Sequence, residues 1–183
     1  YIAFQSCWSL RTVNFPSSLR EIHSYAFHGC SSLLHAFLNE GLQVIEDDAF
    51  RGCSSLKTIR VPSTVERLGA GALASCTSLM TVEISENLKS IGESALDSCH
   101  ELRNVAFPSR VHEFGPKLFC SCTEIRRLLF DNFAVDYFDS YYDDDTNQRL
   151  IDIFKKRFDG LPAHKLCYSH SHQPTAQTIQ GLK

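Results

Sequence analysis

The sequence predicts an α/β solenoid in which 23-residue coils stack on one another, present a face of parallel strands and end in a helical C-terminal cap. Two observations carry this prediction. Six of the eight cysteines, from Cys7 to Cys122, follow one another at intervals of 23 residues. Apolar residues recur with the same period three, six, eight, twelve and fifteen residues after each cysteine. The chain divides into a repeat region at 1–130, an acidic connector at 131–145 and a helical segment at 146–183.

Composition excludes several classes of protein. Of the 183 residues, 43% are hydrophobic and 21% are charged, and the formal net charge is −3, as in an ordinary soluble fold. No run of about 18 apolar residues could form a membrane-spanning helix, and no basic-then-apolar N-terminal segment is typical of a secretory signal. We therefore expect no membrane contact in this segment. The start in mid-pattern, without Met, indicates part of a longer chain.

Each coil is expected to form a strand a few residues after its cysteine. In the coil that begins at Cys53, apolar and polar side chains alternate toward the end of 56–61, so that Ile59 and Val61 point to one side. One coil cannot enclose its own apolar side chains, so successive strands should pair in parallel at about 4.8 Å. Prolines should end this strand in three coils, at Pro16, Pro62 and Pro108.

The opposite wall of each coil, 65–76 in the same unit, is expected to hold a short second strand followed by a helical turn. Strands on one side and bulkier turns on the other should curve the stack into a horseshoe. Glycines recur at one phase of this wall, as Gly69, Gly92 and Gly115. We predict that a turn with positive φ requires glycine there.

The row of cysteines is predicted to consist of buried free thiols, because cysteine is among the residue types most often found in protein interiors. Neighbouring thiols would lie near disulfide distance, but parallel Cβ vectors disfavour the dihedral angle that a disulfide requires. A disulfide stays open as an alternative. A metal site is disfavoured, since spacing of 23 residues supplies no clustered pair of ligands. Free thiols would favour a reducing, cytoplasmic compartment, although the sequence itself does not establish the localisation.

The repeat unit also indicates a family. A period between 20 and 29 residues is typical of leucine-rich repeats, and the unit from Cys53 to Val65, continued by Leu68-Gly69, resembles the BspA-like, or Treponema-type, repeat. Most leucine-rich repeats have Asn or Cys nine residues after the leading Leu. That position is apolar here, as it is in the BspA-like variant. The resemblance covers roughly 1–130 and implies a curved solenoid for protein recognition or adhesion, without a common enzymatic activity.

The side chains four, five and seven residues after each cysteine should point to solvent from the concave strand face, where such a solenoid usually binds. They include six basic residues and one acidic residue, a net charge of +5 on a chain of −3. This excess indicates a protein partner of acidic character, with Leu34, Phe37 and Met80 as apolar anchors. Alternatively, the basic side chains only keep exposed strands soluble. The candidate binding residues are Arg11, His35, Phe37, Lys57, Arg60, Met80, Arg103, Arg126 and Arg127.

No catalytic, metal-binding or cofactor-binding residues are predicted in the repeats. The sequence has no glycine-rich phosphate loop, no Gly-x-Ser-x-Gly and no His-Glu-x-x-His, and its histidines fall at different phases. Nucleic acid is not expected as a partner, because aromatic residues do not interleave with the basic ones. The sequence thus favours a non-catalytic protein-interaction module, with a cell-surface adhesin or glycan-binding solenoid as the alternative.

The period is lost after Phe130. The segment 131–145 contains six Asp but lacks the Gly and Glu of an EF-hand loop, so we predict a solvated connector. A helix capped by Asp145 or Thr146 should follow and cover the last open coil. Its apolar face would be formed by Leu150, Ile151, Phe154 and Phe158.

Two weaker motifs lie near the C-terminus. Pro162-x-His164 is similar to the Pro-Leu-His of an ankyrin repeat, so the start of an ankyrin-like segment is an alternative to a simple cap. Four residues approach the spacing of metal ligands, but a surface turn is favoured over a zinc site. These four are His164, Cys167, His170 and His172.

Overall fold

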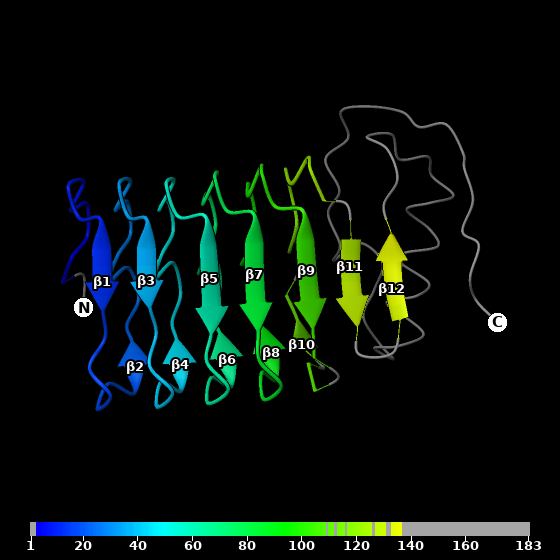
Figure 1. The fold of residues 1–183 in the computed structure, drawn as a ribbon, viewed down its shortest axis with the longest axis horizontal. Coiled ribbons are helices and arrows are strands. Elements are labelled where there is room, and N and C mark those ends of the chain that lie inside the picture. Colours follow the sequence, from blue (N-terminus) through cyan, green and yellow to red (C-terminus); the bar gives the residue numbers. More distant parts are fainter. Residues whose placement is uncertain are drawn as a thin grey trace.

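The computed structural model describes residues 3–108, 110–111, 113–115 and 117–125, and the backbone of 127–130 and 133–136. These residues form a solenoid whose coils follow one another in a row from the N-terminal end (Figure 1). Each coil contributes a longer strand to one wall and a two-residue strand to a second wall. The parallel-strand solenoid predicted from the 23-residue period is therefore confirmed.

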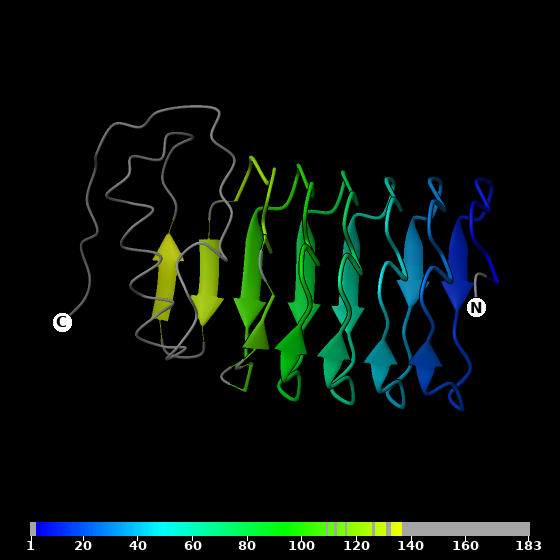
Figure 2. The same cartoon turned by 180° about the vertical axis from the view of Figure 1, so that it is seen from behind.

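The two walls have the same order of strands along the row. The longer strands are β1 (Thr12–Asn14), β3 (His35–Phe37), β5 (Thr58–Val61), β7 (Thr81–Ile84), β9 (Asn104–Phe107) and β11 (Arg127–Phe130). The shorter strands are β2 (Glu21–Ile22), β4 (Val44–Ile45), β6 (Arg67–Leu68), β8 (Ser90–Ile91) and β10 (Glu113–Phe114). Figure 2 shows both rows from behind.

Register along each wall follows the sequence period. Thr58 pairs with Thr81, and Leu68 pairs with Ile91, so that each residue lies beside the residue 23 positions later. All five short strands belong to one parallel sheet, whereas β1 and β3 form a sheet separate from the one that begins at β5. Residues of equal phase therefore form continuous rows, which is why a periodic sequence produces a periodic core.

A third wall consists of turns that are hydrogen-bonded from coil to coil. The amides of Phe27 and Gly29 donate to the carbonyls of Ala49 and Arg51 in the next coil, at 2.8 and 2.7 Å. Two positions of this wall have positive φ in successive coils. One is the residue five before the cysteine, as in Tyr25, Asp48, Gly71, Ser94 and Lys117. The other directly precedes the cysteine, as in Ser6, Gly29, Gly52, Ser75, Ser98 and Ser121.

The prediction of positive φ at Gly69, Gly92 and Gly115 is wrong, because positive φ occurs in the turn wall instead. These glycines are required by close approach of the backbone. A Cβ atom on Gly92 would lie 2.4 Å from the nitrogen of Ala70 and 2.6 Å from the carbonyl carbon of Gly69. The repeated Gly therefore marks the place where one coil lies against the backbone of the preceding coil.

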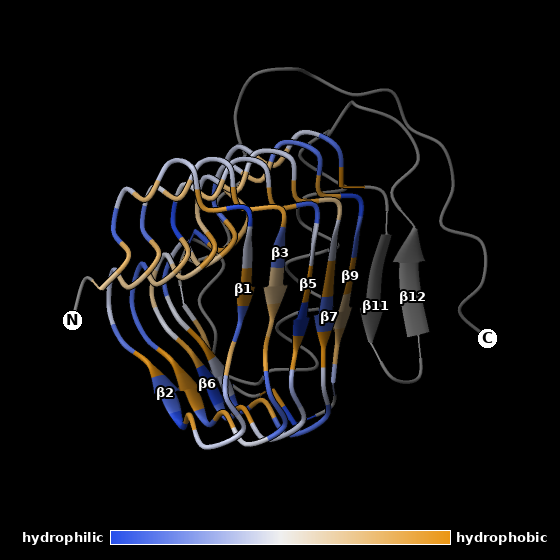
Figure 3. Cartoon of the chain, turned by 60° about the vertical axis from the view of Figure 1, so that its left-hand side comes forward, coloured by the Kyte–Doolittle hydropathy of each residue, from blue (hydrophilic) through white to orange (hydrophobic). Residues whose placement is uncertain are grey.

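The core is a row of apolar side chains that runs the length of the described coils, and among the described residues no charged or polar side chain is buried. In Figure 3, hydrophobic segments recur at equal places in successive coils. The rings of Phe4, Phe27 and Phe50 stack at 5.2 Å between neighbouring centroids. Leu73 and Leu96 continue this row and are fully buried. Apolar burial thus joins each coil to its neighbours.

The end of the row differs from the expectation. β12 (Phe133–Asp136) pairs antiparallel with β11 inside the segment for which a connector was predicted. The sequence analysis did not predict this strand.

The described residues contain strands and turns but no helix, so none could cross a membrane as a helix. The helical turn predicted after the second strand is wrong: residues 70–75 form hydrogen-bonded turns. The predicted helical cap at 146–183 lies outside the described residues. This cap accounts for the α part of the predicted α/β fold class.

Replacing Ser75 with Gly should stabilise the protein. Ser75 has φ of 58°, a conformation that costs an L-residue roughly 1 kcal/mol or more and costs Gly little. After allowing for the flexibility of Gly in the unfolded chain, we expect a gain of about 0.5 to 1 kcal/mol in urea unfolding. Ser78→Gly, the same change at a residue without positive φ, should instead lose stability. A loss in both variants would contradict the role of backbone strain at this position.

Candidate functional site

The strand face consists of the side chains four, five and seven residues after each cysteine, the positions that the sequence analysis selected. The structure describes fifteen of these side chains, and thirteen are exposed. They alternate with buried residues along the strands, as in β5, where Thr58 and Arg60 face solvent while Ile59 and Val61 face the core. The predicted exposure is therefore confirmed for these thirteen positions, while Met80 and Thr81 are half-buried. The side chains of Arg126 and Arg127 lie outside them.

Most basic residues of the strand face have no ion pair within the described residues. Within the part of the chain that the structure describes, Arg11, Lys57 and Arg103 form no ion pair, and Arg60 reaches only Glu40, at 3.9 Å. All three unpaired residues are exposed and occupy the same phase. A positive charge without an internal partner is available to an external one.

On the other walls, several basic residues form ion pairs with acidic residues of a neighbouring coil. Lys89 lies 2.8 Å from Glu66, and Arg67 lies 3.1 Å from Asp47. Exposed pairs of this kind contribute little to stability, at roughly 0.2–1 kcal/mol each. Among the described basic residues outside the strand face, Arg20 forms no ion pair either and donates instead to backbone carbonyls, at 2.9 Å to Ser17.

Apolar side chains lie among the basic ones. Leu34 is 36% exposed and Phe37 is 57% exposed, and the ring of Phe37 stacks on that of His35 at a centroid distance of 5.8 Å. Met80 is half-buried. Large aromatic and flexible apolar side chains within a charged surface are typical of binding sites. The face thus combines positive charge with apolar contact area.

The cysteine row is structural. All seven described cysteines are free thiols, and those of four successive coils are completely buried. The Sγ of Cys76 donates a hydrogen bond to the carbonyl oxygen of Phe50 at 3.3 Å, and that oxygen also accepts the amide of Cys53. Cys53 and Cys99 make the equivalent contact with the preceding coil. Each of these thiols thus adds a weak second hydrogen bond to a carbonyl that already accepts a backbone amide.

Burial raises the pKa of these thiols. It raises the pKa of Cys122 to about 12 and also raises those of Cys53, Cys76 and Cys99. A thiol that keeps its proton is a poor nucleophile and a poor metal ligand. The cysteine row therefore packs the core and forms weak hydrogen bonds, and it does not act as a reactive site.

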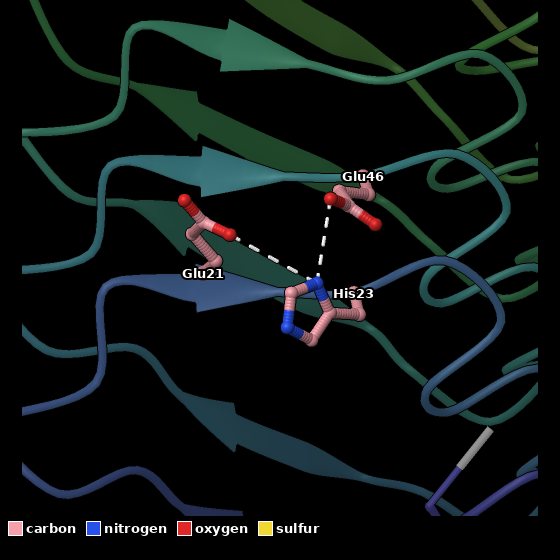
Figure 4. Close-up of side chains that lie close together, drawn as sticks. All are labelled: Glu21, His23 and Glu46. Carbon is pink, nitrogen blue, oxygen red and sulfur yellow. Dashed lines mark ion pairs between the residues drawn. The ribbon is translucent and has the colours of Figure 1, made fainter. Parts of the chain in front are cut away.

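One cluster that the sequence analysis missed joins the first two coils (Figure 4). The Nδ1 atom of His23 lies 3.9 Å from Oε2 of Glu21 and 3.3 Å from Oε1 of Glu46. The amide of Ser24 donates to the Glu46 carboxylate at 2.8 Å, and this bond, against a smaller effect of burial, lowers the pKa of Glu46. The shared phase of His23 and Glu46, 23 residues apart, is the signal that could have revealed it.

These three side chains could each offer one ligand atom to a metal ion, since the atoms lie within 4.8 Å of one another. The Ser24 hydroxyl also donates to Glu46, at 3.0 Å, so the carboxylate already has partners within the protein. The arrangement is explained by its contacts between coils, and the cluster lies away from the strand face. The four C-terminal candidates for zinc, His164 to His172, lie outside the described residues.

Comparison with known proteins agrees with the repeat architecture. The family model described as the BspA type leucine rich repeat region matches residues 1–126 with 6 copies. None of the curated proteins with which the chain was compared matches it. The leucine-rich-repeat protein of T. pallidum is 37% identical, covers 70% of this chain and superposes with a TM-score of 0.68.

Two further solved structures are similar. A leucine-rich cell surface protein of Faecalibacterium prausnitzii is 28% identical over 75% of this chain, with a TM-score of 0.66. The pneumococcal vaccine antigen PcpA is 25% identical over 74% of this chain, with a TM-score of 0.64. The chain spans 61% of the T. pallidum protein and 37% of each of the other two. With six phased repeats and a matching family model, the chain belongs to the BspA-type leucine-rich-repeat family.

Proposed function

We propose that this chain is a protein-interaction module that binds a partner of acidic character through the strand face. The observation that carries the proposal is the set of exposed basic side chains, Arg11, Lys57 and Arg103, that form no ion pair with any residue of the described part of the chain. Repeats of this family form protein-interaction or surface modules. The acidity of the partner and the choice of face are the specific parts of the proposal.

The charge pattern supports binding over a role in solubility. If basic residues only kept exposed strands soluble, pairing them with acids of neighbouring coils would serve as well, as it does for Lys89 and Glu66. Unpaired charges of one sign repel each other and produce a local positive potential. That potential accelerates association with an acidic partner and selects its orientation.

A second candidate function is a cell-surface adhesin or glycan-binding solenoid of the same architecture. It is favoured by the similar protein of Faecalibacterium prausnitzii, which is named a leucine-rich cell surface protein. Neutral glycans would use the apolar and hydroxyl groups of the face more than its charge. Dependence of binding on Lys57 and Arg103 therefore separates the two candidates. For the described residues, we propose no catalytic role.

Charge reversal on the strand face tests the main proposal. A displayed library of random 15-residue peptides, selected on the wild-type protein, should become enriched in Asp and Glu. Binding of the selected peptides should weaken at least ten-fold in the Lys57→Glu/Arg103→Glu variant, measured by fluorescence polarisation.

The matched control is Lys89→Glu/Lys117→Glu, which changes net charge equally but on residues paired with Glu66 and Glu93. It should retain affinity within about two-fold, because the reversed charges lie away from the face. Selected peptides without acidic enrichment, or equal losses in both variants, would contradict an acidic partner on the strand face.

A further inference from the structure

The strand wall is interrupted between the coil that begins at Cys30 and the coil that begins at Cys53. We infer that the partner docks at this junction, with a main-chain peptide group on the backbone there and a large apolar side chain on Leu34 and Phe37. The partner is then a protein segment that carries such a residue between acidic ones. This inference rests on the proposed function and adds to it the place of docking and the chemistry of the segment.

The interruption is visible in the backbone hydrogen bonds. At the other described junctions, the amide four residues after the cysteine donates to the carbonyl at the same position of the preceding coil. These bonds join Leu34 to Arg11 at 2.8 Å, Met80 to Lys57 at 2.9 Å and Arg103 to Met80 at 3.2 Å. Within the described residues no such bond joins Lys57 to Leu34, and β3 and β5 belong to separate sheets. The Leu34 carbonyl and the Lys57 amide therefore lack the backbone partner that their equivalents have.

The two coils remain joined on both sides of this interruption. The amide of Ser55 donates to the carbonyl of Ser31 at 3.1 Å, and that of Glu66 donates to Gln43 at 3.0 Å. The interruption is thus confined to the strand wall and does not separate the coils. Backbone groups without an internal partner are satisfied by water or by a ligand. A peptide group of the partner, which offers both a donor and an acceptor, could bind them, and main-chain bonds of this kind contribute affinity in peptide recognition.

The side chains beside the interruption supply apolar contact area. Leu34 and Phe37 are the exposed large hydrophobic residues of the strand face among the described residues. The ring of His35 stacks on that of Phe37, and Met80 in the fourth coil is half-buried. The position of Phe37 is occupied in the next three coils by Arg60, Glu83 and Ala106. The apolar area is therefore concentrated in the coil that borders the interruption, where an apolar side chain of the partner would lie.

Positive charge lies in the coils on both sides of Leu34. Arg11 is in the preceding coil and Lys57 is in the following one, and both are exposed. Neither forms an ion pair with any residue of the described part of the chain. A partner segment with acidic residues on both sides of its apolar residue would place negative charge near both.

Amide hydrogen exchange, measured by NMR, tests the backbone part of the inference. In the free protein, the amide of Lys57 should be protected at least ten-fold less than the equivalent amides of Met80 and Arg103. A saturating amount of the peptide Asp-Glu-Asp-Phe-Glu-Asp-Glu should then slow exchange at Lys57 at least five-fold. Equal protection of the three amides in the free protein, or unchanged exchange at Lys57 with the peptide bound, would overturn docking on this backbone.

Fluorescence polarisation tests the side-chain part, with the same peptide and a second one in which Ser replaces Phe. The peptide with Phe should bind the wild type at least ten-fold more tightly, and Leu34→Ser/Phe37→Ser should abolish this difference. Phe37→Ser alone should weaken its binding at least five-fold. The matched control is Tyr25→Ser, which removes an exposed aromatic ring from the turn wall and should change affinity less than about two-fold.

The outcomes separate this inference from the proposed function. If both peptides bind equally and both lose affinity in Lys57→Glu/Arg103→Glu, the acidic partner stands and apolar docking at this junction is overturned. Equal losses in Phe37→Ser and Tyr25→Ser would overturn it as well. If neither peptide binds in a charge-dependent way, both proposals fail.

Discussion

Raising the pH from 7.5 to 9.5 should lower the free energy of unfolding by about 5 kcal/mol, because four buried thiols keep their protons only in the folded state. Burial raises the pKa of Cys53, Cys76, Cys99 and Cys122, and also that of Cys30, which adds to this minimum of four groups. In the unfolded chain these thiols titrate near 8.5. One pH unit above that value, each exposed thiol has stabilised the unfolded state by about 1.4 kcal/mol.

The direction follows from proton binding. Above the pKa of the unfolded thiols the folded state holds more protons than the unfolded state, so stability falls as the pH rises. Below that value the contribution is fully present. Urea unfolding in the presence of a phosphine reductant, at several pH values up to 9.5, measures the decline below the ordinary pKa values of tyrosine and lysine.

Variants without selected thiols provide the control. Cys76→Ala/Cys99→Ala removes two of these groups and should reduce the decline by up to half, although the variant starts from lower stability at neutral pH. The single change Cys76→Ala, which perturbs the core less, should reduce the decline by up to a quarter. Equal declines in the wild type and in these variants would show that other groups cause the alkaline destabilisation.

Replacing Gly92 with Ala should destabilise the protein by about 3 kcal/mol, because the added methyl group would overlap the backbone of the preceding coil. Its Cβ would lie 2.4 Å from the nitrogen of Ala70, and the amide of Gly92 is held at 2.8 Å from the carbonyl of Leu68. The coils must separate locally to admit the methyl group, and this weakens hydrogen bonds of the short-strand sheet. Urea unfolding followed by circular dichroism measures the loss.

Gly52→Ala is the matched control. Gly52 has φ of 73°, but an added Cβ would meet nothing nearer than the Cα atom of Gly29, at 3.6 Å. Only backbone strain of roughly 1 kcal/mol is then expected. Losses of the same size in both variants would contradict the assignment of Gly92 to close contact between coils.

The sequence could predict most features that follow from the period. The register of the strands, the exposed position of Lys57 and Arg103 and the burial of the cysteines all derive from stacking residues of equal phase. Features that depend on backbone conformation within a coil could not be predicted in this way. Ser75 and Ser98 adopt positive φ although serine has no preference for it, because the turn wall must return the chain to the next coil.

The composition of the candidate site was predictable from the sequence. The ion pairs of its basic residues were predictable only in part. The excess of basic residues on the strand face is visible from the 23-residue phase. Which basic residues lack partners depends on distances between coils. Arg60 lies near Glu40, whereas Lys57, three residues earlier, forms no ion pair within the described part of the chain. The cluster of Glu21, His23 and Glu46 likewise arises from contact between adjacent coils.

By itself, the amino-acid sequence determined the period, the repeat family and the side of each strand that faces water, because alternation and repetition are properties of a linear pattern. Only the tertiary structure decided that Gly92 serves close approach and that each buried thiol donates to a carbonyl of the coil before it. These features depend on the separation of neighbouring backbones, which stacking fixes and which no single repeat contains.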